Sequence, residues 1–435
     1  MRLLVLFAIC CLAAAQDIRK LTILHSNDLH ARLLPDTNQR GGFAHLATLV
    51  RQERKGCTGC LYIHAGDLVQ GTPVSTLFQG TPVYEIANKL KFDAHTLGNH
   101  EFDYSHRQVP VFLKTAKFPV VSANIVDSGG KLMARKPYLI KKANGVRVAI
   151  IGAVMGDLVE GFLKPNDAGP YRALPVVETM ARYAREVRQR ADIVVVLGHI
   201  HQKEGSQIIQ DVPEVHVVVE GHNHGGRQEL EDVQGRVAVG CQGYGRDLCK
   251  LELEVDRKQK KLVSWKWTKI PVDAKSIAAA PDVQKLVDHW EKKVAEKVDV
   301  KIGESMRVFT QAEFRPVIER AMLDQMKADF TNMNSGGVRD RLPKGTILAR
   351  HIWNIMPFDN KMMTAKVKGS QVPAALRQNK PVEAEKEYTI ALPDYVATNP
   401  AQVKSLGIQG IRFEERDVYL RDVIIEYVKK VQVLR

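Results

Sequence analysis

The stretch Thr96-Leu-Gly-Asn-His-Glu-Phe-Asp103 gathers an amide, an imidazole and a pair of carboxylates. Taken alone, this cluster is ambiguous, because a histidine and an aspartate three residues apart also cap helices or satisfy each other's hydrogen bonds. Its interpretation depends on whether other segments of the chain supply the remaining side chains of a site.

Other segments repeat one arrangement, an apolar run that ends in acid-base or metal-binding side chains. The runs are Leu21-Thr-Ile-Leu24 before Asp28 and His30, Cys60-Leu-Tyr-Ile63 before Asp67, Asp192-Ile-Val-Val-Val-Leu197 before His199 and His201, and Val215-His-Val-Val-Val219 before His222 and His224. Apolar, β-branched runs of this length predict buried strands. Because strand ends meet at one crevice in a sheet covered by helices, we expect these side chains to converge with those of the first stretch. The similar run Val148-Ala-Ile-Ile-Gly152 lacks such an ending, so the pattern is not a general property of the strands.

Length and composition predict a soluble protein of two domains. A chain of 435 residues exceeds the size of a single core, and its content of 45% hydrophobic and 26% charged residues is typical of soluble proteins. The sequence changes character after Trp267, where residues 277–281 resemble a linker and residues 282–298 have the apolar spacing of a helix. We therefore expect domains over residues 17–270 and 301–435, joined by a linker and connecting helix over residues 271–300.

The N-terminus has the pattern of a secretory signal peptide. Arg2 precedes an apolar run from Leu3 to Ala13, and small residues precede Gln16. Since the run is too short for a stable membrane anchor, we predict a signal peptide over residues 1–15 and a secreted protein, periplasmic in a bacterium. A buried N-terminal strand or helix is the alternative. No hydrophobic tail follows Glu426-Tyr-Val-Lys-Lys-Val-Gln-Val-Leu-Arg435, so we expect no lipid anchor of the glycosylphosphatidylinositol type.

Charge and cysteine content limit the kinds of partner and the cellular compartment that we expect. Loss of Arg2 with the signal peptide lowers the formal charge from +14 to +13, which favours acidic ligands. The basic residues lack the aromatic interleaving of a nucleic-acid surface, so no specific nucleic acid is expected. After the signal peptide the cysteines are Cys57, Cys60, Cys241 and Cys249. In an oxidising compartment we expect the local bridges Cys57–Cys60 and Cys241–Cys249, with a zinc site as the alternative.

The motifs at the predicted strand ends resemble those of a known family. They are Asn27-Asp28-Leu-His30, Gly66-Asp67, Gly98-Asn99-His100-Glu-Phe-Asp103, Gly198-His199 and Gly221-His222-Asn-His224. Their order and spacing are similar to those of the calcineurin-like metallophosphatases and, among these, the 5′-nucleotidase family. The resemblance implies an α/β fold, a four-layer αββα sandwich with a dinuclear metal site at one edge, followed by a second, smaller α/β domain.

The same resemblance implies roles for individual side chains. Two divalent ions (Zn, Mn, Fe or Co) would be held by carboxylate, amide and imidazole ligands: Asp28, His30 and His224 for the first ion, Asn99, His199 and His222 for the second, and Asp67 for both. His224 stands where relatives carry Gln or Asn, and imidazole is an equally good ligand.

Residues near the predicted ligands fall into two groups. The resemblance makes His100 and Asp103 the catalytic pair beside the metals, whereas Glu101 and Phe102 serve spacing and packing. Four other histidines near these motifs have no place in the pattern and are expected to be structural; they are His25, His64, His95 and His201.

Hydrolysis of a phosphate ester explains why these residue types belong together. The reaction needs a nucleophile near neutral pH and a sink for negative charge, and two divalent ions about 3.5–4 Å apart supply both. With the carboxylates Asp28 and Asp67, two such ions leave a net charge of about +2 for an anionic phosphoryl group.

The second half of the chain contains a candidate anion site in Asn334-Ser-Gly-Gly-Val-Arg339. A double glycine exposes backbone amides in a tight turn, and an arginine clamps an anion with two hydrogen bonds; an ordinary turn with solvated arginines is the alternative. The predicted substrate-binding residues are Asn334, Gly336, Gly337, Arg339 and Arg341. Together with Met356-Pro-Phe-Asp-Asn360, Val367-Lys-Gly-Ser370 and Tyr388-Thr-Ile-Ala391, this stretch resembles the 5′-nucleotidase C-terminal domain.

That domain normally sandwiches the base of its substrate between two aromatic rings, and the sequence departs from the family at both places. The segment between Leu376 and Glu385 is too short to carry the first ring, and Thr398-Asn-Pro400 replaces the glycine-rich element near the second. Only Tyr395 and Phe413 remain as candidate rings. We therefore expect a poor KM for nucleotides relative to a generic aryl phosphate.

The leading hypothesis is a secreted, metal-dependent phosphoesterase that hydrolyses small phosphate monoesters, with nucleotides as 5′-nucleotidase-like substrates. Alternatives on the same fold are a 2′,3′-cyclic-nucleotide phosphodiesterase, a nucleoside di- or triphosphate hydrolase and a sulfur-ester hydrolase. An alternative of another class is an inactive secreted protein that binds polyanions. The pair of His100 and Asp103 argues against this last reading, because binding alone has no use for it.

Overall fold

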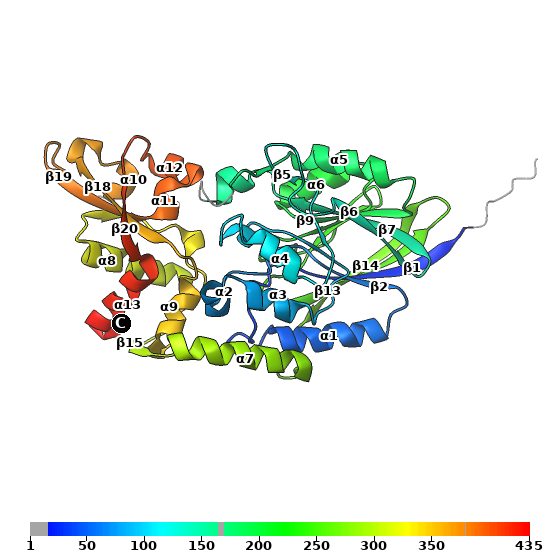
Figure 1. Cartoon of the computed structure of the whole chain (residues 1–435), viewed down its shortest axis with the longest axis horizontal. Coiled ribbons are helices and arrows are strands. Elements are labelled where there is room, and N and C mark those ends of the chain that lie inside the picture. The colour runs from blue at the N-terminus through cyan, green and yellow to red at the C-terminus, as the bar shows by residue number, and fades with distance from the viewer. Residues whose placement is uncertain (1–15, 164–168, 379) are drawn as a thin grey trace, which may run out of the picture.

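The computed structural model describes residues 16–163, 169–378 and 380–435, and the predicted signal peptide lies outside them. Figure 1 shows two bodies side by side along the long axis, the N-terminal one with the larger sheets and the C-terminal one with smaller sheets. Among the helices of the described residues, none has the length and apolar character needed to cross a membrane.

The N-terminal body is built on a pair of six-stranded mixed sheets. The first has the order β14 (Lys261–Pro271), β13 (Asp247–Asp256), β1 (Ile18–Ser26), β2 (Cys60–His64), β3 (Ala94–Thr96) and β4 (Val120–Val121). The second has the order β11 (Glu231–Val233), β12 (Arg236–Gly240), β10 (Val217–Glu220), β9 (Ile193–His199), β7 (Val146–Val154) and β6 (Tyr138–Ala143). A short pair, β5 (Ile125–Val126) and β8 (Arg172–Ala173), lies beside them. Strands β1, β2 and β3 are parallel, as are β7, β9 and β10, so their carboxyl ends share one edge.

Alternating side chains of the strands explain the layers. In β9, Val195 packs between the two sheets whereas Val194 packs against helices, and both are fully buried. This burial on both faces is why these strands are nearly continuous apolar runs. The helices on the two sides include α1 (Phe43–Lys55), α3 (Thr81–Ala87) and α7 (Pro281–Val298) over the first sheet, and α5 (Val176–Val187) and α6 (Gln202–Asp211) over the second. The predicted four-layer αββα sandwich is confirmed.

Helix α7 belongs to the packing of the N-terminal body as well as connecting the two bodies. Val283, Val287 and Val294 are buried in the same apolar cluster as α1, and Arg51 of α1 pairs with Asp282. In Figure 1 the helix runs along the lower edge from α1 toward α9 (Ala349–Ile355). The segment predicted as a connecting helix therefore also covers the first sheet.

The C-terminal body contains a three-stranded and a four-stranded sheet. The first is β17 (Gly345–Leu348), β15 (Lys301–Ser305) and β21 (Val433–Leu434); the second is β16 (Phe330–Thr331), β19 (Glu387–Pro393), β18 (Lys361–Lys368) and β20 (Glu414–Tyr419). The accompanying helices are α8 (Gln311–Met326), α10 (Ala374–Arg377), α11 (Asp394–Thr398), α12 (Pro400–Leu406) and α13 (Leu420–Val431). Thr310 and Glu313 form a capping box that starts α8.

The cysteines form the two expected local disulfides, Cys57–Cys60 and Cys241–Cys249. The predicted zinc alternative is excluded, because both pairs of thiols are consumed. The second bridge closes the loop between β12 and β13, next to the edge where the strand ends meet.

Candidate active site

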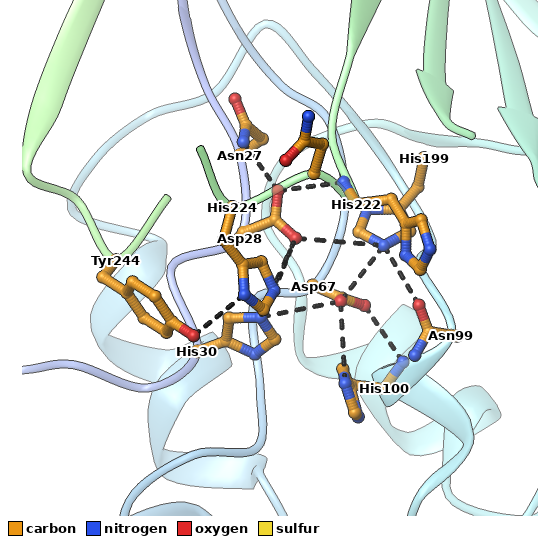
Figure 2. A network of polar contacts seen from close by, with 12 residues as sticks. Asn27, Asp28, His30, Asp67, Asn99, His100, His199, His222, His224 and Tyr244 are labelled. Atoms are coloured by element: carbon orange, nitrogen blue, oxygen red, sulfur yellow. Dashed lines mark hydrogen bonds and ion pairs between the residues drawn. The ribbon is translucent and has the colours of Figure 1, made fainter. Parts of the chain in front are cut away.

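The strand ends bring together all seven predicted metal ligands (Figure 2). They follow β1, β2, β3, β9 and β10: Asp28, His30, Asp67, Asn99, His199, His222 and His224. His199 Nε2 lies 3.1 Å from both Asp67 Oδ2 and Asn99 Oδ1. On the other side, His30 Nε2 lies 2.9 Å from His224 Nε2, which is 3.5 Å from Asp28 Oδ1.

The donor set fits divalent metal ions. Ligand atoms of Asp28, His30, Asp67 and His224 all lie within 4.8 Å of one another. The buried Asp28 Oδ1 accepts no hydrogen bond from the described residues, and a bound cation would satisfy it. Burial lowers the pKa of His222 to about 2 and that of His224 to about 3, so both rings are neutral, which is the form that binds metal.

The two carboxylates respond differently to burial. Burial raises the pKa of Asp28 to about 6, although the nearby His199 opposes this. Burial also acts to raise the pKa of Asp67, but His199 and His100 outweigh it and hold that pKa well below its usual value. Burial acts to lower the pKa of His199, yet Asp67 and Asp28 raise it to about 10, so without metal these groups form an ion pair. A metal ion would replace the proton on His199.

Several of these residues sit in the left-handed backbone region. The φ angles are 51° at Asp28, 47° at His30, 55° at Asp67 and 74° at His222. This conformation is costly for residues other than glycine and is found where the surroundings impose it. Here Asp28 N donates to Gly66 O (3.0 Å) and His30 N donates to Asp67 O (3.1 Å), which ties the end of β1 to the end of β2.

Hydrogen bonds with neighbouring residues fix the orientation of the predicted ligand side chains, as is common at metal sites. His199 Nδ1 donates to Ala65 O at 2.8 Å, which leaves Nε2 as the ligand atom. His224 Nδ1 hydrogen-bonds the hydroxyl of Tyr244 at 2.9 Å, and Asn27 Nδ2 donates to Asp28 Oδ2 at 2.6 Å. Asn27 also exchanges hydrogen bonds with the backbone of Cys241, so the disulfide loop supports both Asp28 and His224.

His100 and Asp103 lie beside the ligand cluster as a hydrogen-bonded pair. They belong to the 3₁₀ turn after β3, where His100 Nδ1 donates to Asp103 Oδ2 at 2.8 Å. The backbone N–H of His100 donates to Asp67 Oδ1 at 3.0 Å. Burial acts to lower the pKa of His100, but the carboxylates of Asp103 and Asp67 raise it above its ordinary value.

Glu101 has a role that the sequence did not reveal. Its buried carboxylate accepts hydrogen bonds from the backbone N–H groups of Asp67 (3.2 Å), Leu68 (2.8 Å) and Gly98 (2.5 Å). It therefore joins the loop after β2 to the loop after β3. The adjacent Phe102 is fully buried in an apolar cluster, as expected.

A cavity of about 280 Å³ lies between the ligand cluster and the C-terminal body. Most of the predicted substrate-binding residues line it: Asn334, Gly336, Gly337 and Arg339. Arg339 Nη2 lies 3.5 Å from His30 Nε2, which places its guanidinium beside the cluster. Arg341 is not among the described lining residues; it contacts Thr37 and Asn38 instead.

Aromatic rings form part of the cavity wall. Tyr395 is one of them, as the sequence suggested, whereas Phe413 packs elsewhere in the C-terminal body. Phe162 and Phe358 also line the cavity. No sequence pattern pointed to Phe162, which lies on a π-helical turn (Leu158–Phe162). Phe358 lies in the motif at 356–360, but no role was predicted for its ring.

The histidines without a predicted role do not join the ligand cluster. His25, His64 and His95 are fully buried beneath the strand ends. His201 hydrogen-bonds Asp157, and its ring lies 4.9 Å from that of His222.

Comparison with known protein families agrees with the site. Residues 21–226 match the family model of calcineurin-like phosphoesterases, and residues 294–381 match that of the 5′-nucleotidase C-terminal domain. These matches and the site define a metal-dependent hydrolase of phosphate esters. The chain belongs to the calcineurin-like phosphoesterases that carry a 5′-nucleotidase C-terminal domain.

Individual relatives cover most of the chain. It is similar to Protein UshA of Yersinia enterocolitica, with 27% identity over 92% of this chain and 83% of that protein. A 5′-nucleotidase of Vibrio cholerae is 26% identical over 82% of this chain and 75% of that protein.

Solved structures share the fold over nearly the whole length. A 5′-nucleotidase precursor from Thermus thermophilus superimposes with a TM-score of 0.86 at 21% identity, covering 96% of this chain and 97% of that one. The sulfate thiohydrolase SoxB of the same genus gives a TM-score of 0.81 at 15% identity, covering 95% of both chains. At these identities the likeness establishes the fold and leaves the substrate open.

Proposed function

We propose that this protein is a secreted hydrolase of small phosphate monoesters, with nucleoside monophosphates among its substrates. The observation that carries the proposal is the single cavity that joins the ligand cluster, the His100–Asp103 pair and Arg339. Its volume of about 280 Å³ is close to the lower end of the usual range for small-molecule sites, which favours a compact ester over a polymer.

We assign the seven clustered residues to two divalent ions, with Asp67 between them. When bound, such ions lower the pKa of water and withdraw charge from the attacking and leaving oxygens. The assignment is supported by the neutral rings of His222 and His224 and by Asp28 Oδ1, which accepts no hydrogen bond from the described residues. The mixed oxygen and nitrogen donors suit Zn, Mn, Fe or Co.

The chain's own residues perform the remaining steps. Arg339 draws the phosphate anion toward the cluster and orients it through its planar guanidinium. Asp103 holds the Nδ1–H of His100, so Nε2 is the atom that hydrogen-bonds the phosphoryl group or delivers a proton to the leaving oxygen. Phe358 lies next to both side chains, with its ring centroid 5.9 Å from the His100 ring and 5.9 Å from Arg339 Cζ.

Selection of a nucleoside is supported by the rings that line the cavity. Phe162 is contributed by the N-terminal body and Tyr395 by the C-terminal body, and the Tyr395 hydroxyl donates to Gly161 O at 3.2 Å. Flat aromatic walls favour a nucleobase through stacking. These rings weaken the expectation, drawn from the missing family elements, that nucleotides bind poorly.

A substrate panel tests the proposal. AMP, ADP, ATP, 2′,3′-cyclic AMP and p-nitrophenyl phosphate are incubated with the purified protein and added Mn²⁺ or Zn²⁺, and released phosphate or ring-opened product is measured. We expect AMP and p-nitrophenyl phosphate to be hydrolysed, with a KM for AMP no higher than that for the aryl ester. Preferential turnover of cyclic AMP or ATP would favour the alternative activities, and metal-loaded protein that hydrolyses no ester would refute the proposal.

A further inference from the structure

Gln70 is a buried residue of the cavity wall whose side chain finds no hydrogen-bond partner in the described part of the chain. It lies in the loop after β2, three positions beyond Asp67, and is 1% exposed. Neither its amide nitrogen nor its amide oxygen forms a hydrogen bond with any of the described residues. Leaving a buried polar group unpaired costs roughly 1–3 kcal/mol, so a side chain in this state requires an explanation.

The loop that carries Gln70 is held tightly. The backbone N–H of Gln70 donates to Ser75 Oγ at 2.9 Å, and the Tyr104 hydroxyl donates to the same oxygen at 2.9 Å. The next residue, Gly71, approaches the loop after β1 so closely that an added Cβ would lie 2.7 Å from His30 O. Gln70 itself has a left-handed φ of 67°. This conformation costs free energy outside glycine and is common at ligand sites, so it agrees with a binding role but does not by itself identify one.

The other residues of the cavity wall indicate which groups could hydrogen-bond the Gln70 amide. Asp67, His100, Arg339 and Gln70 line the same space, so the amide belongs to the wall around a phosphate ester drawn in by Arg339. A phosphoryl group offers acceptors for the amide N–H, and water or an alcohol hydroxyl offers a donor for the amide oxygen. A substrate with its attacking water or its hydroxyl therefore satisfies both halves of the side chain.

We propose that Gln70 is a substrate-binding residue whose Nε2 donates a hydrogen bond to a non-bridging oxygen of the phosphoryl group. The inference rests on the proposed function, because it takes the cavity as the phosphate-ester site. None of the described residues pairs with the amide, and a bound phosphoryl oxygen supplies the missing acceptor. Gln70 thus raises the affinity of the protein for phosphate.

Replacement of Gln70 by methionine, which has a similar length but no hydrogen-bonding amide, tests this role in phosphate binding. We expect Gln70→Met to weaken competitive inhibition by inorganic phosphate about tenfold and to shrink the rise in Tm that phosphate produces, with metal content unchanged and Tm without phosphate no lower than in the wild type. Gln70→Glu, which adds a negative charge, should weaken phosphate binding further. The matched control is Gln79→Met, because Gln79 is an exposed glutamine with a φ of 49° that lies outside the cavity wall. This variant should change neither the inhibition by phosphate nor the rise in Tm that phosphate produces.

The outcomes separate this inference from the proposed function. If phosphate protects Gln70→Met as strongly as the wild type, or if affinity falls only together with metal content, the assignment of Gln70 is wrong while the hydrolase proposal stands. If phosphate fails to protect the metal-loaded wild type and no ester is hydrolysed, the proposed function fails first, and Gln70 with it.

Discussion

At the scale of single residues, the turn after β3 divides into side chains with different tasks. Asn99 faces the ligand cluster, while His100 is held by Asp103 beside it. We predict that His100→Ala lowers kcat by about 100- to 10,000-fold, the usual contribution of a positioned proton donor, and leaves the metal content intact. The check is metal analysis and turnover on the same preparation. Loss of metal in proportion to activity would contradict the division of tasks.

His216 is a residue outside the site whose burial makes stability depend on pH. Its Nδ1 accepts from Val194 N at 3.0 Å, its Nε2 donates to Lys260 O at 2.9 Å, and burial lowers its pKa from 6.5 to about 4. Between these values the unfolded chain binds a proton that the folded chain does not, so stability falls as pH drops from 6.5 toward 4. At pH 5 this single group lowers the free energy of unfolding by about 2 kcal/mol.

Replacing His216 by glutamine removes this titration. His216→Gln keeps a donor for Lys260 but does not titrate, so we expect it to be less stable than the wild type at pH 7.5 and to lose about 2 kcal/mol less on acidification to pH 5. Urea unfolding at both pH values measures this. Parallel losses in the two proteins would show that His216 is protonated in the folded state.

At the scale of elements, Glu101 links the loop after β2 with the loop after β3. Replacement by Gln removes one of two carboxylate oxygens while three N–H groups still need acceptors. We predict a 10- to 100-fold loss of metal affinity, the usual effect of disturbing a ligand's support, with kcat close to normal at saturating metal. Titration with a competing chelator measures the affinity. Glu204→Gln is the control, because Glu204 similarly accepts from His201 N and Gly156 N in another loop; an equal loss there would remove the special role of Glu101.

The sequence predicted those strands that are marked by a continuous run of apolar residues. The apolar runs before Asp28, Asp67 and His199 became β1, β2 and β9, because strands buried on both faces require continuous apolar residues. The position of Glu101 was visible in the sequence but its function was not, since a carboxylate that accepts from backbone groups of a distant loop leaves no spacing signal. Phe162 was missed for a similar reason: it reaches the cavity from a π-helical turn that no periodicity predicts.

At the scale of the whole molecule, the proposed metal ions would connect strand ends of both sheets. Ligands after β1, β2 and β3 belong to the first sheet, and those after β9 and β10 to the second. Each ion present at 100 times its Kd stabilises the folded state by about 2.7 kcal/mol. We therefore predict that EDTA lowers Tm and that added Mn²⁺ or Zn²⁺ restores it. Asp67→Ala should unfold at the temperature of the chelated wild type and show no further shift with EDTA; a full shift in this variant would argue against a bridging Asp67.

The loop closed by Cys241–Cys249 gives the site a dependence on oxidative maturation. Cys241 holds Asn27 through its backbone, and Tyr244 within the loop holds His224, so covalent closure fixes partners of two candidate ligands at once. A newly made chain in a reducing compartment carries every ligand but lacks this closure. We therefore expect full hydrolase activity to require an oxidising compartment, because the bridge whose loop supports Asp28 and His224 forms there.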